Sequence, residues 1–124
     1  MMKVLVTIPA EQEHREYLEK IGKKIGEKTG KTLEFYYVPR GGATKEQVLQ
    51  ADIILGNVPP EFLKDAKHLK FLQLDSAGAV EYASDKVIPE GAKLANATGA
   101  YGLAISEYML GCVLMLRKKL NLYQ

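Results

Sequence analysis

Apolar and polar residues alternate along the chain in blocks of two kinds: short β-branched or aromatic runs, and longer segments with apolar residues at helical spacing. Residues 3–8 form an apolar run that ends at Pro9, which is typical of a buried strand. In the Glu- and Lys-rich segment 11–28, Leu18, Ile21 and Ile25 recur at helical spacing and predict a helix with one apolar face. Gly30 is suited to end that helix.

The same two patterns continue to the end of the chain. We expect further strands over residues 33–38, 52–56, 71–74 and 93–96. Thr44 and Gln47 have the spacing of a capping box, which predicts a helix from there to about residue 50. Proline suits the first turn of a helix, so Pro59 and Pro60 should open one that covers residues 61 to about 66. The last expected helix is mostly apolar and runs from about residue 103 to 120.

Strands that alternate with helices indicate an α/β protein with a parallel sheet and helices on both of its faces. Five such strands within residues 1–100 predict a flavodoxin-like, doubly wound domain, and residues 101–124 then form a long apolar helix that leads away from it. In sheets of this kind, ligands bind at the carboxyl ends of the strands. Here those ends carry the segments 56–57, 75–78 and 96–99.

The terminal helix needs a partner. Between Leu103 and Leu116, only Ser106 and Glu107 interrupt the apolar character, so side chains on every side of the helix require cover. One sheet covers one side of a helix, and the uncovered side is an interface candidate. We therefore expect a homodimer through helix 103–120, with an interface that includes the residues Met109, Val113 and Leu116.

Composition narrows the class of protein. With 124 residues, 47% hydrophobic and 26% charged, the chain has the length and content of one globular domain. The 17 basic and 15 acidic residues nearly cancel, which does not favour nucleic-acid binding. Cys112 is the only cysteine, so no intrachain disulfide can form, and we expect a cytoplasmic location. The apolar run 103–116 is shorter than the roughly 20 residues of a membrane span, so no membrane partner is expected.

Most reactive side chains have an ordinary explanation. His14 and His68 lack further ligands at metal-binding spacing, and we expect no metal. Cys112 lies in the apolar helix, where a small buried hydrophobic residue is expected more often than a nucleophile. The acidic residues at 11, 13, 16 and 19 fit a solvated helix face better than an acid–base pair. The chain contains no G-x-G, so it lacks the dinucleotide-binding fingerprint, and no catalytic residue is assigned.

Two small-residue turns remain as candidate sites. Ser76, Ala77 and Gly78 follow an expected strand, and successive backbone N–H groups in such a turn can form a nest for a carboxylate. A second permissive turn over residues 96–102 leads into the last helix. Taken alone, each turn is as readily explained as a plain structural connection.

Three segments occur in order and at suitable spacing: 51–56 (ADIILG), 69–78 (LKFLQLDSAG) and 96–108 (NATGAYGLAISEY). In combination they resemble the N-terminal, substrate-binding part of the D-isomer-specific 2-hydroxyacid dehydrogenase family. The resemblance covers residues 48–120, whereas the first strand and helix are generic. In that family a flavodoxin-like substrate domain comes first, and a long interdomain helix then crosses into a Rossmann domain that binds NAD or NADP. No Rossmann domain is present in this chain.

The resemblance also implies roles for individual residues. The backbone N–H groups of Ala77 and Gly78 would hold the substrate carboxylate, with Ser76 and Asn57 also in the substrate site. The cofactor would lie near Ala77 and Glu107, and the cleft would be shaped by Asn96, Gly99 and Tyr101. The catalytic Arg, Glu and His of the family lie in the following domain or beyond it and match no position here. Glu107 belongs to the interdomain helix and does not correspond to the catalytic glutamate. The chain alone is therefore expected to be inactive.

Two functions follow from these patterns. The first is the substrate-binding part of an NAD(P)-dependent oxidoreductase that interconverts small D-2-hydroxy acids and 2-keto acids. The alternative is a stand-alone flavodoxin-like interaction or regulatory module that dimerises through its C-terminal helix. Val80 and Thr98 stand where many family members carry an acidic and a basic residue, so the resemblance does not indicate which acid is used.

Overall fold

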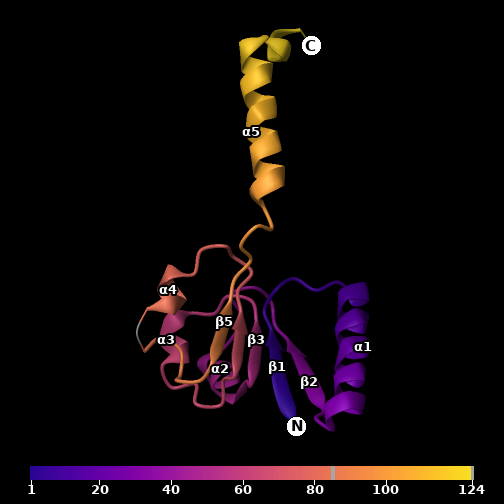
Figure 1. Ribbon diagram of the computed structural model, residues 1–124, viewed down its shortest axis with the longest axis vertical. Helices are drawn as coiled ribbons and strands as arrows, with labels where there is room; N and C mark the ends of the chain where they lie inside the picture. Colours follow the sequence, from indigo (N-terminus) through magenta and orange to yellow (C-terminus); the bar gives the residue numbers. More distant parts are fainter. Residues whose placement is uncertain (85, 124) are drawn as a thin grey trace.

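A five-stranded, all-parallel sheet forms the body of the protein, in a computed structural model that describes residues 1–84 and 86–123. Its strand order is β2-β1-β3-β4-β5 (Figure 1). The strands are β1 (Met2–Val6), β2 (Leu33–Tyr37), β3 (Ile53–Leu55), β4 (Phe71–Gln73) and β5 (Lys93–Ala95). The α/β class and the parallel sheet are confirmed, and the order is compatible with a flavodoxin-like fold.

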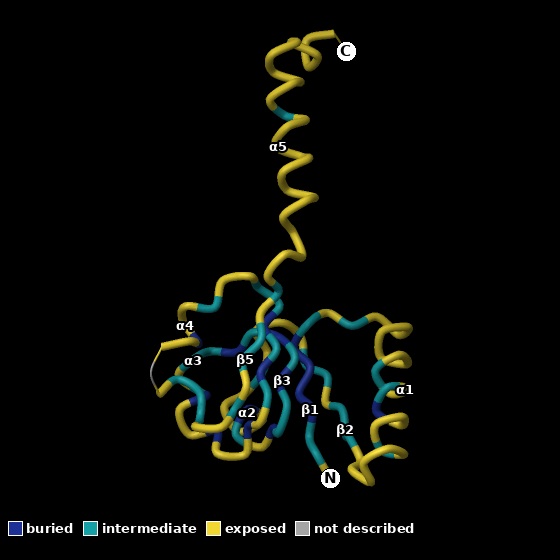
Figure 2. The backbone as a smooth tube through the Cα atoms, in the orientation of Figure 1, coloured by how far each residue is buried: buried dark blue, intermediate teal, exposed yellow. Residues whose placement is uncertain are grey.

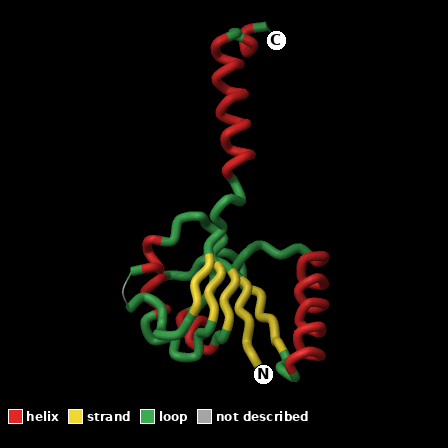
Figure 3. The backbone as a smooth tube through the Cα atoms, viewed as in Figure 1, coloured by secondary structure: helices red, strands yellow, loops and turns green. Residues whose placement is uncertain are grey.

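Helices lie on both sides of the sheet (Figure 3). They are α1 (Gln12–Thr29), α2 (Lys45–Gln50), α3 (Pro60–Leu63), α4 (Val80–Ala83), α5 (Gly102–Arg117) and the 3-10 turn η1 (Leu120–Leu122). α1 lies on one side, and the short helices α2 to α4 gather on the other. The sequence pattern did not predict α4, and it placed the end of the terminal helix at residue 120, where the chain instead forms η1.

Local hydrogen bonds explain where the helices begin and end. At α2 the Gln47 amide donates to Thr44 Oγ1 at 3.2 Å and the Thr44 amide donates to Gln47 Oε1 at 2.9 Å, which is the predicted capping box. At α1 the Glu11 amide donates to His14 Nδ1 at 3.1 Å, so His14 acts as a helix cap. Gly30 ends α1 with a φ of 70°, as predicted, because glycine adopts this left-handed conformation without strain.

The hydrophobic core lies between the sheet and helices α2 to α4. Leu5, Ile54 and Leu72 are aligned across β1, β3 and β4, and all three are buried on this side. Leu94 continues the row on β5 and packs against the same core. Because successive side chains of a strand point to opposite faces, this row assigns its sequence neighbours to the side of α1.

The side of the sheet that carries α1 is covered only in part. A Cβ atom at Gly22 of α1 would come within 3.0 Å of the Phe35 ring on β2, so the absence of a side chain there lets α1 approach β2 closely. Over β3 to β5, no described helix lies on this side (Figure 3). We call this region the open face; it comprises Ile53, Leu55, Phe71, Gln73, Lys93 and Ala95. Lys93 is exposed and the other five are partly exposed.

Helix α5 stands away from the sheet, beyond the carboxyl ends of the strands (Figure 2). None of its residues is buried, and Leu103 and Tyr108 expose 73% and 75% of their surface. The expectation that Cys112 is buried is wrong: its thiol is free and partly exposed, because the described part of the chain buries no residue of α5. No helix in the described residues combines the length and hydropathy needed to cross a membrane.

Replacement of Leu72 by alanine should test the position of the core. Leu72 is fully buried, so Leu72→Ala removes apolar contacts and leaves a cavity that costs about 2–5 kcal/mol of unfolding free energy. Leu122→Ala makes the same chemical change at a side chain that is 70% exposed, and it should change that free energy by less than about 0.5 kcal/mol. Urea unfolding followed by circular dichroism measures both values. Equal effects would contradict the assigned core.

Candidate functional site

The loops that follow β3, β4 and β5 meet at one edge of the sheet. These three strands are neighbours and run parallel, so their carboxyl ends lie side by side. Gly56 and Asn57 follow β3, residues 75–78 follow β4, and residues 96–101 follow β5. The structure therefore brings together the three segments that the sequence singled out, at the edge where doubly wound sheets bind ligands.

Asn57 connects the loop after β3 to the turn after β4. Its Nδ2 donates to Ser76 Oγ at 3.0 Å, and its Oδ1 accepts from the Asp75 amide, also at 3.0 Å. The Ser76 hydroxyl in turn donates to the Gly78 carbonyl at 2.9 Å. Because this hydroxyl accepts a hydrogen bond from Asn57 and donates one to Gly78, Ser76 serves to shape the turn.

The segment after β5 closes the other side of the turn. Asn96 Nδ2 donates to the Ala77 carbonyl at 2.8 Å, and the Ala97 amide donates to the Ser76 carbonyl at 2.9 Å. The Tyr101 hydroxyl donates to the Asp75 carbonyl. Asn96 and Tyr101 thus touch the turn directly, and Gly99, with a φ of 85°, lets the chain reverse between them.

Three backbone donors of the turn have no partner among the described residues. The carbonyls of residues 75 to 78 all accept hydrogen bonds, yet the amides of Ser76, Ala77 and Gly78 donate to no described residue. A Cβ atom at Gly78 would meet no atom within 4 Å, so the turn is open to its surroundings. Free N–H groups on an open turn can bind an anion such as a carboxylate by donating hydrogen bonds to it.

Arg40 adds a charge that the sequence reasoning missed. It follows β2, and its Nη2 lies 2.6 Å from Asp75 Oδ2, so it neutralises the carboxylate that directly precedes the free amides. The Arg40 side chain remains 66% exposed, whereas that of Asp75 is 21% exposed. Its position after β2 places Arg40 at the same edge of the sheet, but the sequence gives no sign that Asp75 is its partner.

Two further contacts hold the loop after β3 in place beside the turn. Gly56 has a φ of 113°, and a Cβ atom there would collide with Thr7 Oγ1, so only glycine fits between the ends of β1 and β3. The buried Tyr82 hydroxyl of α4 donates to the Val58 carbonyl at 2.7 Å and ties the segment after the turn to the loop after β3. Burial raises the pKa of Tyr82, which keeps this donor protonated well above neutral pH.

Glu107 is placed apart from these residues. It lies on α5, is exposed, and makes no hydrogen bond or ion pair with any described residue. The cofactor role assigned to Ala77 and Glu107 stays a prediction. Thr98 lies within the site, and its hydroxyl donates to Asn96 Oδ1 at 2.9 Å.

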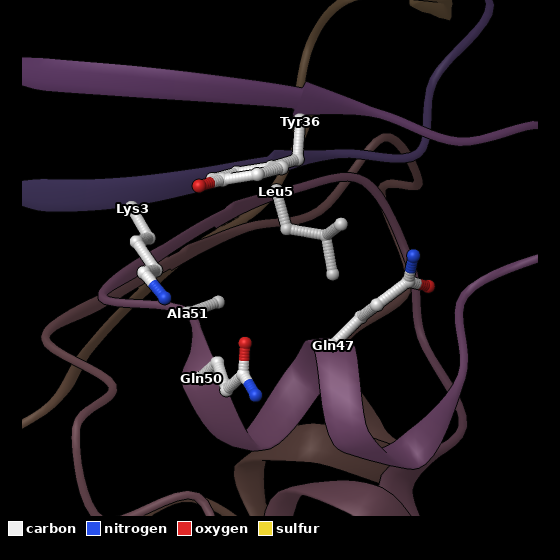
Figure 4. Close-up of a pocket in the computed structure, with 6 residues that line it drawn as sticks. All are labelled: Lys3, Leu5, Tyr36, Gln47, Gln50 and Ala51. Atoms are coloured by element: carbon white, nitrogen blue, oxygen red, sulfur yellow. The ribbon is translucent and has the colours of Figure 1, made fainter.

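Other candidate sites are weaker. Within residues 1–84 and 86–123, no three His, Cys, Asp or Glu side chains are grouped to hold a metal ion. A small hollow between the sheet and α2 is lined by Lys3, Leu5, Tyr36, Gln47, Gln50 and Ala51 (Figure 4). Its only charged lining residue is Lys3, and it holds no acid–base pair, so it adds nothing to the chemistry at the carboxyl edge.

Asn57→Ala should loosen the turn while the sheet remains folded. The change removes two partly buried hydrogen bonds and leaves the Asp75 amide without its partner, which costs about 1–3 kcal/mol. Amide hydrogen exchange should then speed up at Asp75, whose N–H loses its acceptor, more than in β1. Asn121→Ala, at an exposed residue of η1, is the matched control and should leave both rates unchanged. Unchanged exchange in Asn57→Ala would contradict the role of Asn57.

The chain matches no protein-family model, no curated protein and no solved structure. The family resemblance therefore rests on the three sequence segments alone, and the geometry of the turn is the basis for assigning a function.

Proposed function

We propose that the chain is the substrate-binding part of an NAD(P)-dependent oxidoreductase that interconverts small D-2-hydroxy acids and 2-keto acids. The observation that carries the proposal is the set of free amides at Ser76, Ala77 and Gly78, on an open turn at the carboxyl edge of the sheet. Two or three N–H groups directed at a carboxylate make charge-assisted hydrogen bonds, which are stronger than neutral ones. The family resemblance supplies the class of acid.

The turn is suited to hold an anion because its geometry is fixed before the ligand arrives. Asn57 and Asn96 fasten it from both sides, so binding does not have to order the backbone first. Arg40 contributes electrostatically: without it, the Asp75 carboxylate would repel a second carboxylate at the neighbouring amides. The open space at Gly78 leaves room for the ligand.

The described residues do not form a site for the pyrophosphate of a dinucleotide. That site needs a glycine-rich turn that opens a helix, and the chain has no G-x-G. Within the turn, the Asp75 carboxylate is paired with Arg40 and the Ser76 hydroxyl is hydrogen-bonded. The chain on its own therefore binds the acid without converting it, and the reaction requires a dinucleotide-binding domain, to which α5 would lead as the interdomain helix.

The alternative function, an interaction module that dimerises through its terminal helix, draws on a different observation. Helix α5 exposes apolar side chains along its whole length and buries none. Contiguous exposed apolar surface of this kind marks protein interfaces. The two functions are compatible, since the turn and α5 are separate parts of the molecule. A cytoplasmic location stays a prediction for both.

Titration with D-lactate tests the carboxylate site. We expect the amide resonances of Ser76, Ala77 and Gly78 to shift in ¹H–¹⁵N spectra, with a dissociation constant on the order of 1 mM. Lactamide, which lacks the charge, should leave them unmoved. Gly78→Val should abolish the shifts without unfolding the chain, because its side chain enters open space. Gly111→Val, at an equally open position on α5, should bind like the wild type. Equal responses to lactate and lactamide would overturn the proposal.

A pair of charge-removing variants tests the role of Arg40. Arg40→Ala leaves the Asp75 charge uncompensated beside the bound carboxylate, which should weaken D-lactate binding about fivefold, or ~1 kcal/mol. Arg40→Ala combined with Asp75→Asn removes both charges and should restore the wild-type dissociation constant. If the double variant bound as weakly as Arg40→Ala, Arg40 would contact the ligand itself. Unchanged binding in both variants would show that the ion pair has no influence on the turn.

A further inference from the structure

We propose that α5 packs on the open face of a second copy of the chain, and that α5 of the second copy packs on the open face of the first. The two copies then form a reciprocal dimer. Each of these two surfaces lacks a packing partner, and both belong to the same chain. This inference does not depend on the turn binding a carboxylate, because neither surface includes residues 75–78.

The first surface is α5 itself. Its side chains Leu103, Ile105, Met109, Leu110 and Val113 expose between 55% and 73% of their area, and no residue of the helix is buried. A helix with apolar residues on every side is stable in water only when other elements cover it. Figure 2 shows α5 exposed along its length, beyond the sheet whose own open face lacks a helix.

The second surface is the open face, and the connections of the fold explain why it is uncovered. Right-handed crossovers place α1 on one side of the sheet, and they place α2 to α4 on the other, because the direction of strand addition reverses at β1. These crossovers leave the side of α1 without a described helix over β3 to β5. That place holds Ile53, Leu55 and Phe71 with no described helix above them.

The anchored connection to α5 indicates a second copy as the source of the helix. Asn96 and Ala97 bond to the turn after β4, and Tyr101, the residue before α5, donates to the Asp75 carbonyl. These contacts direct α5 outward, past the edge of its own sheet (Figure 1). To cover its own open face, the helix would have to reverse its direction relative to the sheet. A neighbouring copy can receive α5 without that reversal.

Buried area and charge favour a reciprocal exchange. With 16 residues, α5 is about 24 Å long and about 10 Å wide, so one contact buries roughly 250 Å² on each partner. Two reciprocal contacts bury roughly 1,000 Å², the size from which specific interfaces begin, whereas a single α5–α5 contact reaches half of that. Each surface also carries one charge of opposite sign, Lys93 on the open face and Glu107 between residues 103 and 116.

A mixed cross-linking experiment tests this arrangement, because Cys112 is the only native cysteine. One copy carries Ile53→Cys together with Cys112→Ser, and the other is the wild type. A bismaleimide linker of about 10 Å should join the two copies in the mixture, with peptides that contain positions 53 and 112. Tyr36→Cys with Cys112→Ser places a thiol on the opposite side of the sheet and should give no cross-link.

Two further measurements exclude the other arrangements. Light scattering at micromolar concentration should give a dimer, and Met109→Glu should make it monomeric without changing the circular dichroism of the sheet, because α5 buries nothing in its own chain. A monomer in the wild type, or an intramolecular link between positions 53 and 112 in Ile53→Cys, would overturn the proposal by showing that α5 folds back. Wild-type dimers linked only through Cys112 would overturn it in favour of α5–α5 pairing.

Discussion

The carboxamide of Asn57 joins two loops that are separate in the sequence, and the candidate site depends on this contact. One end of the amide donates to Ser76 and the other accepts from the Asp75 backbone, so the turn after β4 is fixed relative to the loop after β3. Asn96 completes the arrangement from β5. Because these contacts use the carbonyls, the serine hydroxyl and the Asp75 amide, the amides of Ser76, Ala77 and Gly78 remain for a ligand.

Short-range patterns were sufficient to predict most of the elements. The capping box at Thr44 and the glycine end of α1 depend on residues within one helical turn, and both were predicted correctly. The helix α4 was missed because Ala79 provides no side-chain cap, and these four residues are held by the packing of Tyr82 into the core and by its hydrogen bond to the Val58 carbonyl. Local sequence carries no sign of that tertiary contact.

The candidate site also contains features set by local sequence and features set by tertiary contacts. The turn itself could be predicted, because small residues follow an apolar run that ends at the carboxyl edge of a parallel sheet. Arg40 could not, since its partner Asp75 lies 35 residues later and the pair exists only when β2 and β4 are both in the sheet. The direction of α5 was also beyond the sequence, because it depends on how Tyr101 contacts the turn.

The proposed function depends on the amides of residues 76–78 binding a carboxylate. A crystal structure of the 124-residue chain soaked with oxamate, an unreactive analogue of a 2-keto acid, tests it most directly. The account predicts an oxamate carboxylate within hydrogen-bonding distance of the Ala77 and Gly78 nitrogens, with the Arg40–Asp75 pair intact beside it. Oxamate bound elsewhere on the protein, with this turn accessible in the crystal and empty, would contradict it.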